Sequence, residues 1–430
     1  MVIMLWDTAN LASSDAVNLT RKDVPKPSKN FKADCEKLCE TFQVPMHPCL
    51  ARNSAGENGS VEFRNHRVDP CTMKIVLHVL KSCDSISQLR FLNTGLSAGD
   101  ISTMAAALPQ TSITKLSLDF NPVAMDDEEE QQSQQGIDAA GAITTASPFL
   151  PLVSASSGLM LSQLSLRGCG IDDMGIAQFC ECLEQNTSLK GLNLFGNAIG
   201  DAGAAALTQL LKVNTQLSCL SLADNRVETA GMDAFQELLN GYEVAEDLMA
   251  KRDVSEKLIA ASNKSITDAA KKKKETPQLI PDLPSMEERE NGRLRTDILK
   301  YLSDPSCSPS SLLPQKHCKK SIALAQLKPC CPCHSSHVFY SPAICYPFHS
   351  SRAFASWFAG GNTSLKVLAL SGNTIGCQAI EQLLCFLCEK AAIAEDDTPG
   401  LEALYLQRCG ADSTPEIREM LGRVEVRVVL

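Results

Sequence analysis

The sequence predicts a curved α/β solenoid, with parallel strands on its concave face and helices on its convex face, interrupted by two insertions. The first observation is a unit that starts at Leu161, Leu189 and Leu217 and so recurs every 28 residues. The second is a change of period within each unit, from the alternation typical of a strand to the spacing typical of a helix. One such unit cannot bury its apolar face alone, so neighbouring units must stack around a continuous core.

The central unit shows how each repeat is built. It reads Leu189-x-x-Leu192-x-Leu194-x-x-Asn197-x-Ile199. Leu192 and Leu194 alternate and therefore point to one face of a short strand. Asn197 follows where the chain turns, and its side chain can bond neighbouring backbone. A helix is predicted after the turn from the spacing of Gly203, Leu207, Leu210 and Leu211.

Seven units can be recognised, beginning at Ile86, Ile113, Leu161, Leu189, Leu217, Leu365 and Leu401. The turn position carries Thr94 in the first unit and Asn or Cys in the others: Asn121, Cys169, Asn197, Asn225, Asn373 and Cys409. We predict that these six Asn and Cys side chains have a structural role. A period of 28 with a full helix in each unit resembles the ribonuclease-inhibitor type of leucine-rich repeat, a class that accepts either residue there.

Composition changes along the chain divide it into seven predicted segments. They are an N-terminal extension, partly disordered (1–60); N-terminal repeats (61–125); an acidic, low-complexity insertion (126–157); central repeats (158–241); a charged helix (242–275); a Pro/Ser/Cys-rich linker, expected to be disordered (276–358); and C-terminal repeats (359–430). The acidic run that begins at Asp126 is typical of a solvated loop. If residues 126–157 replace a repeat helix, the solenoid would be interrupted there.

The segment 303–352 differs in composition from the rest of the chain. It holds six of the 19 cysteines and four of the seven histidines, among them Cys330, Cys331, Cys333, His334 and His337. These five residues could ligate zinc, but no paired Cys-x-x-Cys units frame them. We favour a disordered linker. A second interpretation is translated intron from a faulty gene model.

Charge and hydropathy exclude several classes of function. The formal net charge is −10, which argues against binding to nucleic acid or to an anionic membrane by bulk positive charge. No apolar run approaches the roughly 18 residues of a membrane-spanning helix. The apolar start, Met1–Trp6, is too short for a secretory signal and has no basic flank before it. We therefore expect a cytoplasmic protein with reduced thiols.

No pattern of catalytic residues is visible. The phosphate-binding, dinucleotide-binding, zinc-protease and nucleophile-elbow motifs are all missing from the sequence. We expect no enzyme activity, no cofactor, no metal and no small-molecule substrate. The outward strand positions instead carry residues suited to binding another protein: Leu92, Arg167, Asn193, Phe195 and Tyr405.

The order of parts resembles one family in particular. Leu118–Pro122, Leu164–Arg167, Leu192–Asp201 and Leu220–Val227 are similar to successive repeats of the leucine-rich repeat-containing protein 71 family. In that family a charged helix and a low-complexity linker follow, and the repeats then resume. The acidic insertion and the Cys/Pro-rich segment depart from the family pattern. The resemblance implies a non-catalytic component of the motile ciliary axoneme that acts through protein contacts.

Two alternatives use the same scaffold. The first is a regulator of a small GTPase, in which Arg167, Arg226 or Arg408, each just after a strand, would act as an arginine finger. The second is a ubiquitin-ligase adaptor, although no adaptor motif precedes the repeats. The run Lys271–Lys274 suggests an acidic partner such as a tubulin surface, and a solvated helix end is the simpler interpretation.

Overall fold

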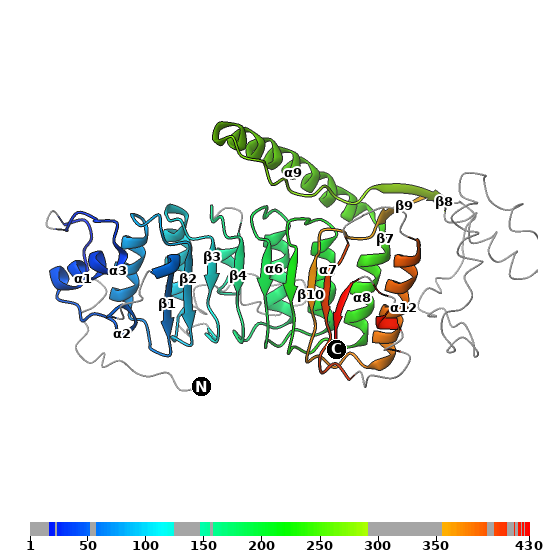
Figure 1. The fold of residues 1–430 in the computed structure, drawn as a ribbon, viewed down its shortest axis with the longest axis horizontal. Helices are drawn as coiled ribbons and strands as arrows, with labels where there is room; N and C mark the ends of the chain where they lie inside the picture. Colours follow the sequence, from blue (N-terminus) through cyan, green and yellow to red (C-terminus); the bar gives the residue numbers. More distant parts are fainter. Residues whose placement is uncertain are drawn as a thin grey trace, which may run out of the picture.

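The computed structural model describes residues 17–21, 24–51, 57–123, 147–154, 158–290, 355–393, 400–410, 417, 420–422, 424 and 426–430. Figure 1 shows an elongated solenoid in which the strands lie side by side along the length of the molecule, with helices packed behind them. The main sheet is entirely parallel and has the order β1-β2-β3-β4-β5-β6-β10-β11-β12. The predicted fold class is confirmed.

The seven predicted units supply seven of these strands. They are β2 (Gln88–Leu92), β3 (Lys115–Ser117), β4 (Gln163–Ser165), β5 (Gly191–Asn193), β6 (Cys219–Ser221), β10 (Val367–Ala369) and β11 (Ala403–Tyr405). Two further strands extend the sheet, β1 (Ser60–Arg64) before β2 and β12 (Arg427–Val429) after β11. In β1, Val61 and Phe63 are buried and pair with Leu89 and Phe91, the matching positions of the next unit. The described sheet therefore has one more strand at each end than the sequence predicted.

A helix layer covers one face of the sheet. It consists of α3 (Pro70–Leu80), α4 (Ala98–Ala107), α6 (Asp173–Leu183), α7 (Asp201–Leu211), α8 (Thr229–Asn240) and α12 (Cys377–Ile393). At the N-terminal end, α1 (Phe31–Phe42) packs on α3, and α2 (Pro48–Ala51) packs on β1. Asp69 caps α3 through the Thr72 amide, and Ser97 forms a capping box with Asp100 at the start of α4. The leucines of strand and helix meet between the two layers as one apolar core.

The first insertion leaves the sheet intact. β3 pairs directly with β4, with Leu116 opposite Leu164, so the described residues show no break in the solenoid at this point. Residues 124–146 lie outside the described part. The chain returns through a short 3₁₀ helix, η4 (Leu150–Leu152), which contacts α4 and α6 and so takes the place of a repeat helix. Phe149 and Val153 beside it are 2% and 1% exposed, and they fill the apolar layer there.

The second insertion also leaves the sheet continuous, because β6 pairs with β10. The charged helix predicted at 242–275 is observed as α9 (Glu246–Lys273). A small antiparallel sheet, β7-β9-β8, stands beside it and consists of β7 (Gly241–Val244), β9 (Ala355–Gly360) and β8 (Met286–Glu290). The sequence did not predict these strands, and β8 and part of β9 fall within the range expected to be a disordered linker. The segment 303–352, with its candidate zinc ligands, lies outside the described residues.

Two kinds of feature are absent from the described residues. No helix in this part of the chain is both long and apolar enough to cross a bilayer. No group of three or more His, Cys, Asp or Glu side chains there could hold a metal ion.

The N-termini of two helices are capped by the preceding repeat. Gly200 and Glu228, the residues before α7 and α8, supply no side-chain cap of their own. Asp173, the first residue of α6, instead accepts hydrogen bonds from the amides of Gly200 (2.7 Å) and Gly203 (2.9 Å). Asp201 accepts the equivalent bonds from Glu228 and Gly231 one repeat later. Each acid therefore fixes the spacing between two neighbouring helices.

The close approach at Gly203 gives a first prediction. A Cβ atom at this position would lie 2.6 Å from both Asp173 Oδ1 and Ile199 Cγ2, well inside van der Waals contact. Gly203→Ala should therefore lower the free energy of unfolding by about 1–3 kcal/mol, although alanine is the better helix former. The measurement is the midpoint of urea unfolding followed by circular dichroism.

Gly99→Ala is the matched control. Gly99 is also helical, but the only nearby atom that a Cβ there would meet is Ser97 Oγ, at 3.7 Å. Its midpoint should be unchanged or slightly higher. Equal urea midpoints for the two variants would show that a Cβ atom at position 203 is tolerated beside Asp173, and would contradict the prediction.

Candidate functional site

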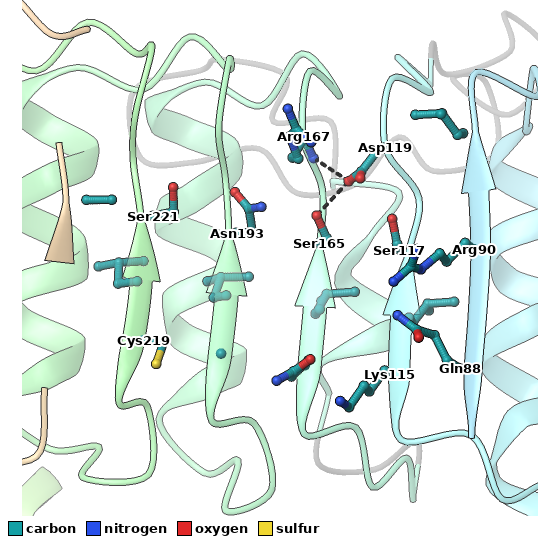
Figure 2. Close-up of a pocket in the computed structure, with 18 of the residues that line it drawn as sticks. Gln88, Arg90, Lys115, Ser117, Asp119, Ser165, Arg167, Asn193, Cys219 and Ser221 are labelled. Carbon is teal, nitrogen blue, oxygen red and sulfur yellow. Dashed lines mark hydrogen bonds between the residues drawn. The ribbon is translucent and has the colours of Figure 1, made fainter. Parts of the chain in front are cut away.

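The concave face of the sheet is hollowed into a shallow groove of about 540 Å³ (Figure 2). Strands β1 to β6 and β10 line it with the side chains that point away from the helix layer. The alternation of the strands places them there, because every buried leucine is flanked by two outward residues. We refer to this surface as the concave groove.

The structure brings four of the five predicted binding residues to this region. Leu92, Arg167 and Asn193 line the concave groove. Phe195 lies just past the end of β5, and its backbone amide donates to Asn193 Oδ1 at 3.1 Å. Tyr405 is on β11, beyond the strands that line the groove.

Arg167 is held between two aromatic rings. Its guanidinium carbon lies 4.7 Å from the ring centre of Phe195 and 5.5 Å from that of Phe120. Phe120 reaches this position with a left-handed backbone (φ 57°), which the sequence pattern did not predict. Contacts of this kind are worth about 0.5–1 kcal/mol at exposed sites. The two rings therefore hold the Arg167 guanidinium at the C-terminal ends of the strands.

Asp119 is fixed beside this stack by bonds to the neighbouring strand. Its Oδ1 accepts from Ser165 Oγ at 2.6 Å and from the backbone amide of Arg167 at 3.1 Å, the two dashed lines in Figure 2. Both of these hydrogen bonds connect the end of β3 to the β4 unit. The side chain of Arg167 remains directed to the aromatic rings.

The N-terminal half of the groove is basic. Glu62 pairs with Arg64 at 2.6 Å, so these two charges compensate each other. Arg90, Lys115 and Arg167, on or just after β2, β3 and β4, form no ion pair with another described residue. All three line the same half of the groove, on a chain whose net charge is −10. This half of the groove can therefore attract an acidic surface.

The other half is lined by small, uncharged side chains. Gly191, Cys219, Val367 and Ala369 lie across β5, β6 and β10. Such side chains leave the backbone of the strands accessible to a partner. The groove thus combines a charged end, suited to orienting a partner, with an end that a partner can approach closely.

The predicted turn residues bond to the preceding repeat. Asn197 Nδ2 donates to Leu166 O at 2.9 Å, while its Oδ1 accepts from the amides of Cys169 and Ile171. Asn121, Asn225 and Asn373 make equivalent bonds to the repeats before them. Cys169 and Cys409 use the thiol instead, donating to the carbonyls of Leu118 (3.3 Å) and Leu370 (3.1 Å).

A second series of asparagines, which we did not predict from the sequence, lies just before the N-terminal ends of the strands. Asn186, Asn214 and Asn362 each donate to a carbonyl of the preceding repeat, and each accepts from amides two and three residues ahead. The signal was present as Asn-Thr-x-Leu at the end of three repeats. Side-chain hydrogen bonds between repeats are therefore present at both ends of the strands.

The arginines considered as catalytic fingers differ in their surroundings. Arg408 pairs with Asp224 at 2.7 Å, and Arg167 is stacked as described. Arg226 is exposed and follows β6. The three are not gathered at one site.

The described cysteines range from buried to exposed. Burial raises the pKa of the Cys169 and Cys180 thiols to about 12 and that of Cys39 to about 11. Burial also raises the pKa of Cys35. Cys219 is exposed on the concave groove. It is therefore a natural position for a probe on this face.

Comparison with known proteins supports the repeat class. The family model described as "Leucine Rich repeat" matches residues 185–207 and 361–378, which include parts of the units that begin at Leu189 and Leu365. The chain carries leucine-rich repeats. The specific family suggested by the order of parts is not established by this match.

Two further comparisons add little. No curated protein matches the chain. Among solved structures, "Leiomodin-1 Actin-Binding Site 2 (ABS2)" is similar over 41% of this chain and 94% of its own, at 16% identity and a TM-score of 0.22.

The contrast between the exposed Cys219 and the buried Cys169 and Cys180 gives a second prediction. Iodoacetamide reacts with the thiolate, so at pH 8 the native protein should be alkylated at Cys219 and remain unmodified at Cys169 and Cys180. Peptide mass spectrometry measures the extent at each site. In guanidinium, where burial is lost, all three should react. Native alkylation of Cys169 as fast as that of Cys219 would contradict the assigned burial.

Proposed function

We propose that the protein is a scaffold that binds another protein through the concave groove. The observation that carries the proposal is the grouping of Arg90, Lys115 and Arg167 on three successive units beside the small-residue half of the groove. The parallel strands hold these side chains at fixed spacing, so the binding surface exists before the partner arrives. Affinity then depends on complementary charge and shape rather than on refolding.

The repeat architecture supports binding rather than chemistry at this face. The two carboxylates of the groove, on Glu62 and Asp119, are engaged by Arg64 and by β4 respectively. Arginine and aromatic side chains, such as the stacked Arg167 and the rings of Phe120 and Phe195, are enriched at protein interfaces.

Site-specific photo-cross-linking in the native cell locates the binding face. A benzophenone amino acid replacing Asn193 should give a discrete cross-linked product, because this residue lines the groove. The same amino acid replacing the exposed Gln209, on helix α7 of the same repeat, is the matched control and should not give that product. Cross-linking from Gln209 alone would overturn the proposal.

Charge reversal tests the chemistry of the same face. Arg90→Glu with Lys115→Glu should weaken the complex about tenfold or more, because both cations lie in the groove and would then repel an acidic partner. Arg167→Glu with Phe195→Ala, which removes the stack, should have a similar effect. Affinity is measured with the purified cross-linked partner, and circular dichroism checks folding.

Lys37→Glu on α1 is the control for Arg167→Glu with Phe195→Ala, because each lowers the net charge by two. Lys26→Glu is added to it to match the change of four in Arg90→Glu with Lys115→Glu. Both lysines are exposed, and Lys37 lies on a helix packed against α3, away from the groove. Neither control should change binding. Unaltered affinity in the folded double variants of the groove would contradict the proposal.

We further propose that the partner belongs to the motile ciliary axoneme. The support is the order of parts, in which repeats, a charged helix, an insertion and further repeats succeed one another as in the leucine-rich repeat-containing protein 71 family. The tagged protein should localise to flagella and remain on the axoneme after detergent extraction. Full release by detergent, or absence from flagella, would contradict this assignment and leave the groove proposal standing.

A further inference from the structure

A second surface stands apart from the concave groove, on helix α9. Figure 1 shows α9 leaving the body of the solenoid as a long projecting rod. The chain then returns along it, so that α9 and residues 274–284 form a two-layered unit, here called the α9 arm. No residue of the α9 arm lines the concave groove.

The base of the α9 arm is fixed by a buried arginine. Arg252 is 1% exposed, and its Nη1 donates to the hydroxyl of Tyr242 at 2.9 Å and to Lys212 O at 3.3 Å. Its Nη2 donates to Pro284 O, which closes the returning segment onto the base. Lys251 adds an ion pair with Glu184 of the α6 repeat, at 2.5 Å. The arm is therefore attached to the repeats by its first two turns.

The outer half of the α9 arm is stiffened by its own returning segment. Asn263 on the helix exchanges two hydrogen bonds with the backbone of Ile280, at 2.8 and 3.0 Å. Ile259 and Ile280 are 6% and 4% exposed, although they lie on a projecting element. The helix rises 1.5 Å per residue, so its last turn is held about 30 Å from Arg252.

Positive charge gathers at this outer end. The residues from Lys257 to Glu275 include six lysines and only two acids, Asp268 and Glu275. The inner part, from Glu246 to Glu256, carries four acids and two basic residues. The arm is thus polarised along its length, with a basic tip on an acidic chain.

The basic tip has a defined shape. One face of α9 bears an open depression of about 510 Å³, lined by Ala261, Lys264, Ser265, Asp268, Ala269, Lys272 and Lys273. The small side chains recur at positions 261, 265 and 269, along one face of the helix. Asp268 is paired with Lys271 at 3.7 Å. Lys264, Lys272 and Lys273 form no ion pair with any other described residue.

We propose that this depression is a docking site for an acidic peptide segment of a partner protein. The small residues allow an extended backbone to approach the helix, and the three lysines would pair with its carboxylates. A lipid surface fits less well, because a helix that lies on a membrane presents large apolar side chains, and none lines the depression. Single-stranded nucleic acid fits less well because no aromatic side chain is present for stacking.

The test uses the full-length protein and a fluorescein-labelled deca-glutamate peptide, with binding followed by fluorescence anisotropy. Lys264→Glu, Lys272→Glu and Lys273→Glu together should weaken binding at least tenfold at 50 mM salt. Affinity of the unaltered protein should fall at 200 mM salt, because the contacts are exposed and ionic. The matched control is Lys26→Glu, Lys37→Glu and Lys81→Glu, three exposed lysines elsewhere with the same change in net charge. An equal loss of peptide affinity in both triple variants would show that binding depends only on the net charge of the protein, and would overturn the proposal.

A charge-neutral variant tests the shape. Ala269→Trp fills the depression without altering its charge and should also weaken peptide binding at least tenfold. Normal binding by this variant would overturn docking in the depression. Binding to phosphatidylserine vesicles with none to the peptide would also overturn the proposal.

Discussion

The structure depends on one recurring interaction, the hydrogen bond between a side chain of one repeat and the backbone of a neighbouring repeat. At the end of each strand the chain turns tightly, and its amides and carbonyls face the core, where an unmet bond is costly. Asn197 meets three of these groups at once, one through its amide nitrogen and two through its oxygen. At the N-terminal ends of the strands, Asn214 donates to two carbonyls of the preceding repeat. At the start of α7, two amides donate to Asp173 of the preceding repeat. Because every bond joins neighbours, each repeat completes the one beside it.

This arrangement explains why two long insertions leave the solenoid continuous. What a repeat must supply is a short strand, a turn side chain and an apolar cover for the strand. The connection between these parts can vary. In the first insertion, η4 with Phe149 and Val153 provides the cover that a helix gives elsewhere. In the second, Asn373 reaches Val227 across 146 positions of sequence and bonds it as if the two repeats were adjacent. The concave groove crosses this junction without interruption, because β6 and β10 both line it.

The repeated strands and most of their helices could be predicted from the sequence because leucine alternation repeats at a constant period. β1 was missed because its unit has Asn58 and His66 where the others carry an apolar residue and a turn Asn, Cys or Thr. β12 comes only 24 residues after β11, out of step with that period. The contact between Arg167 and Phe195 follows from register, since they are one period apart, but the left-handed Phe120 that completes the stack has no signature in the pattern. Arg252 shows the clearest limit: on a charged helix an arginine is expected in solvent, and its burial depends on acceptors from three separate segments.

The pairing of β6 with β10 has a consequence for how the chain is made. Ribosomes add about 5–20 residues per second, so the roughly 145 residues between these strands take on the order of 10–30 seconds to synthesise. During that interval the first six strands can assemble, but the outer edge of β6 has no neighbour. Its short length, three residues, limits what it can recruit in the meantime. The newborn protein therefore passes through a stage in which a solenoid of six strands, ending in an unprotected edge, is kept from pairing wrongly by the brevity of its last strand.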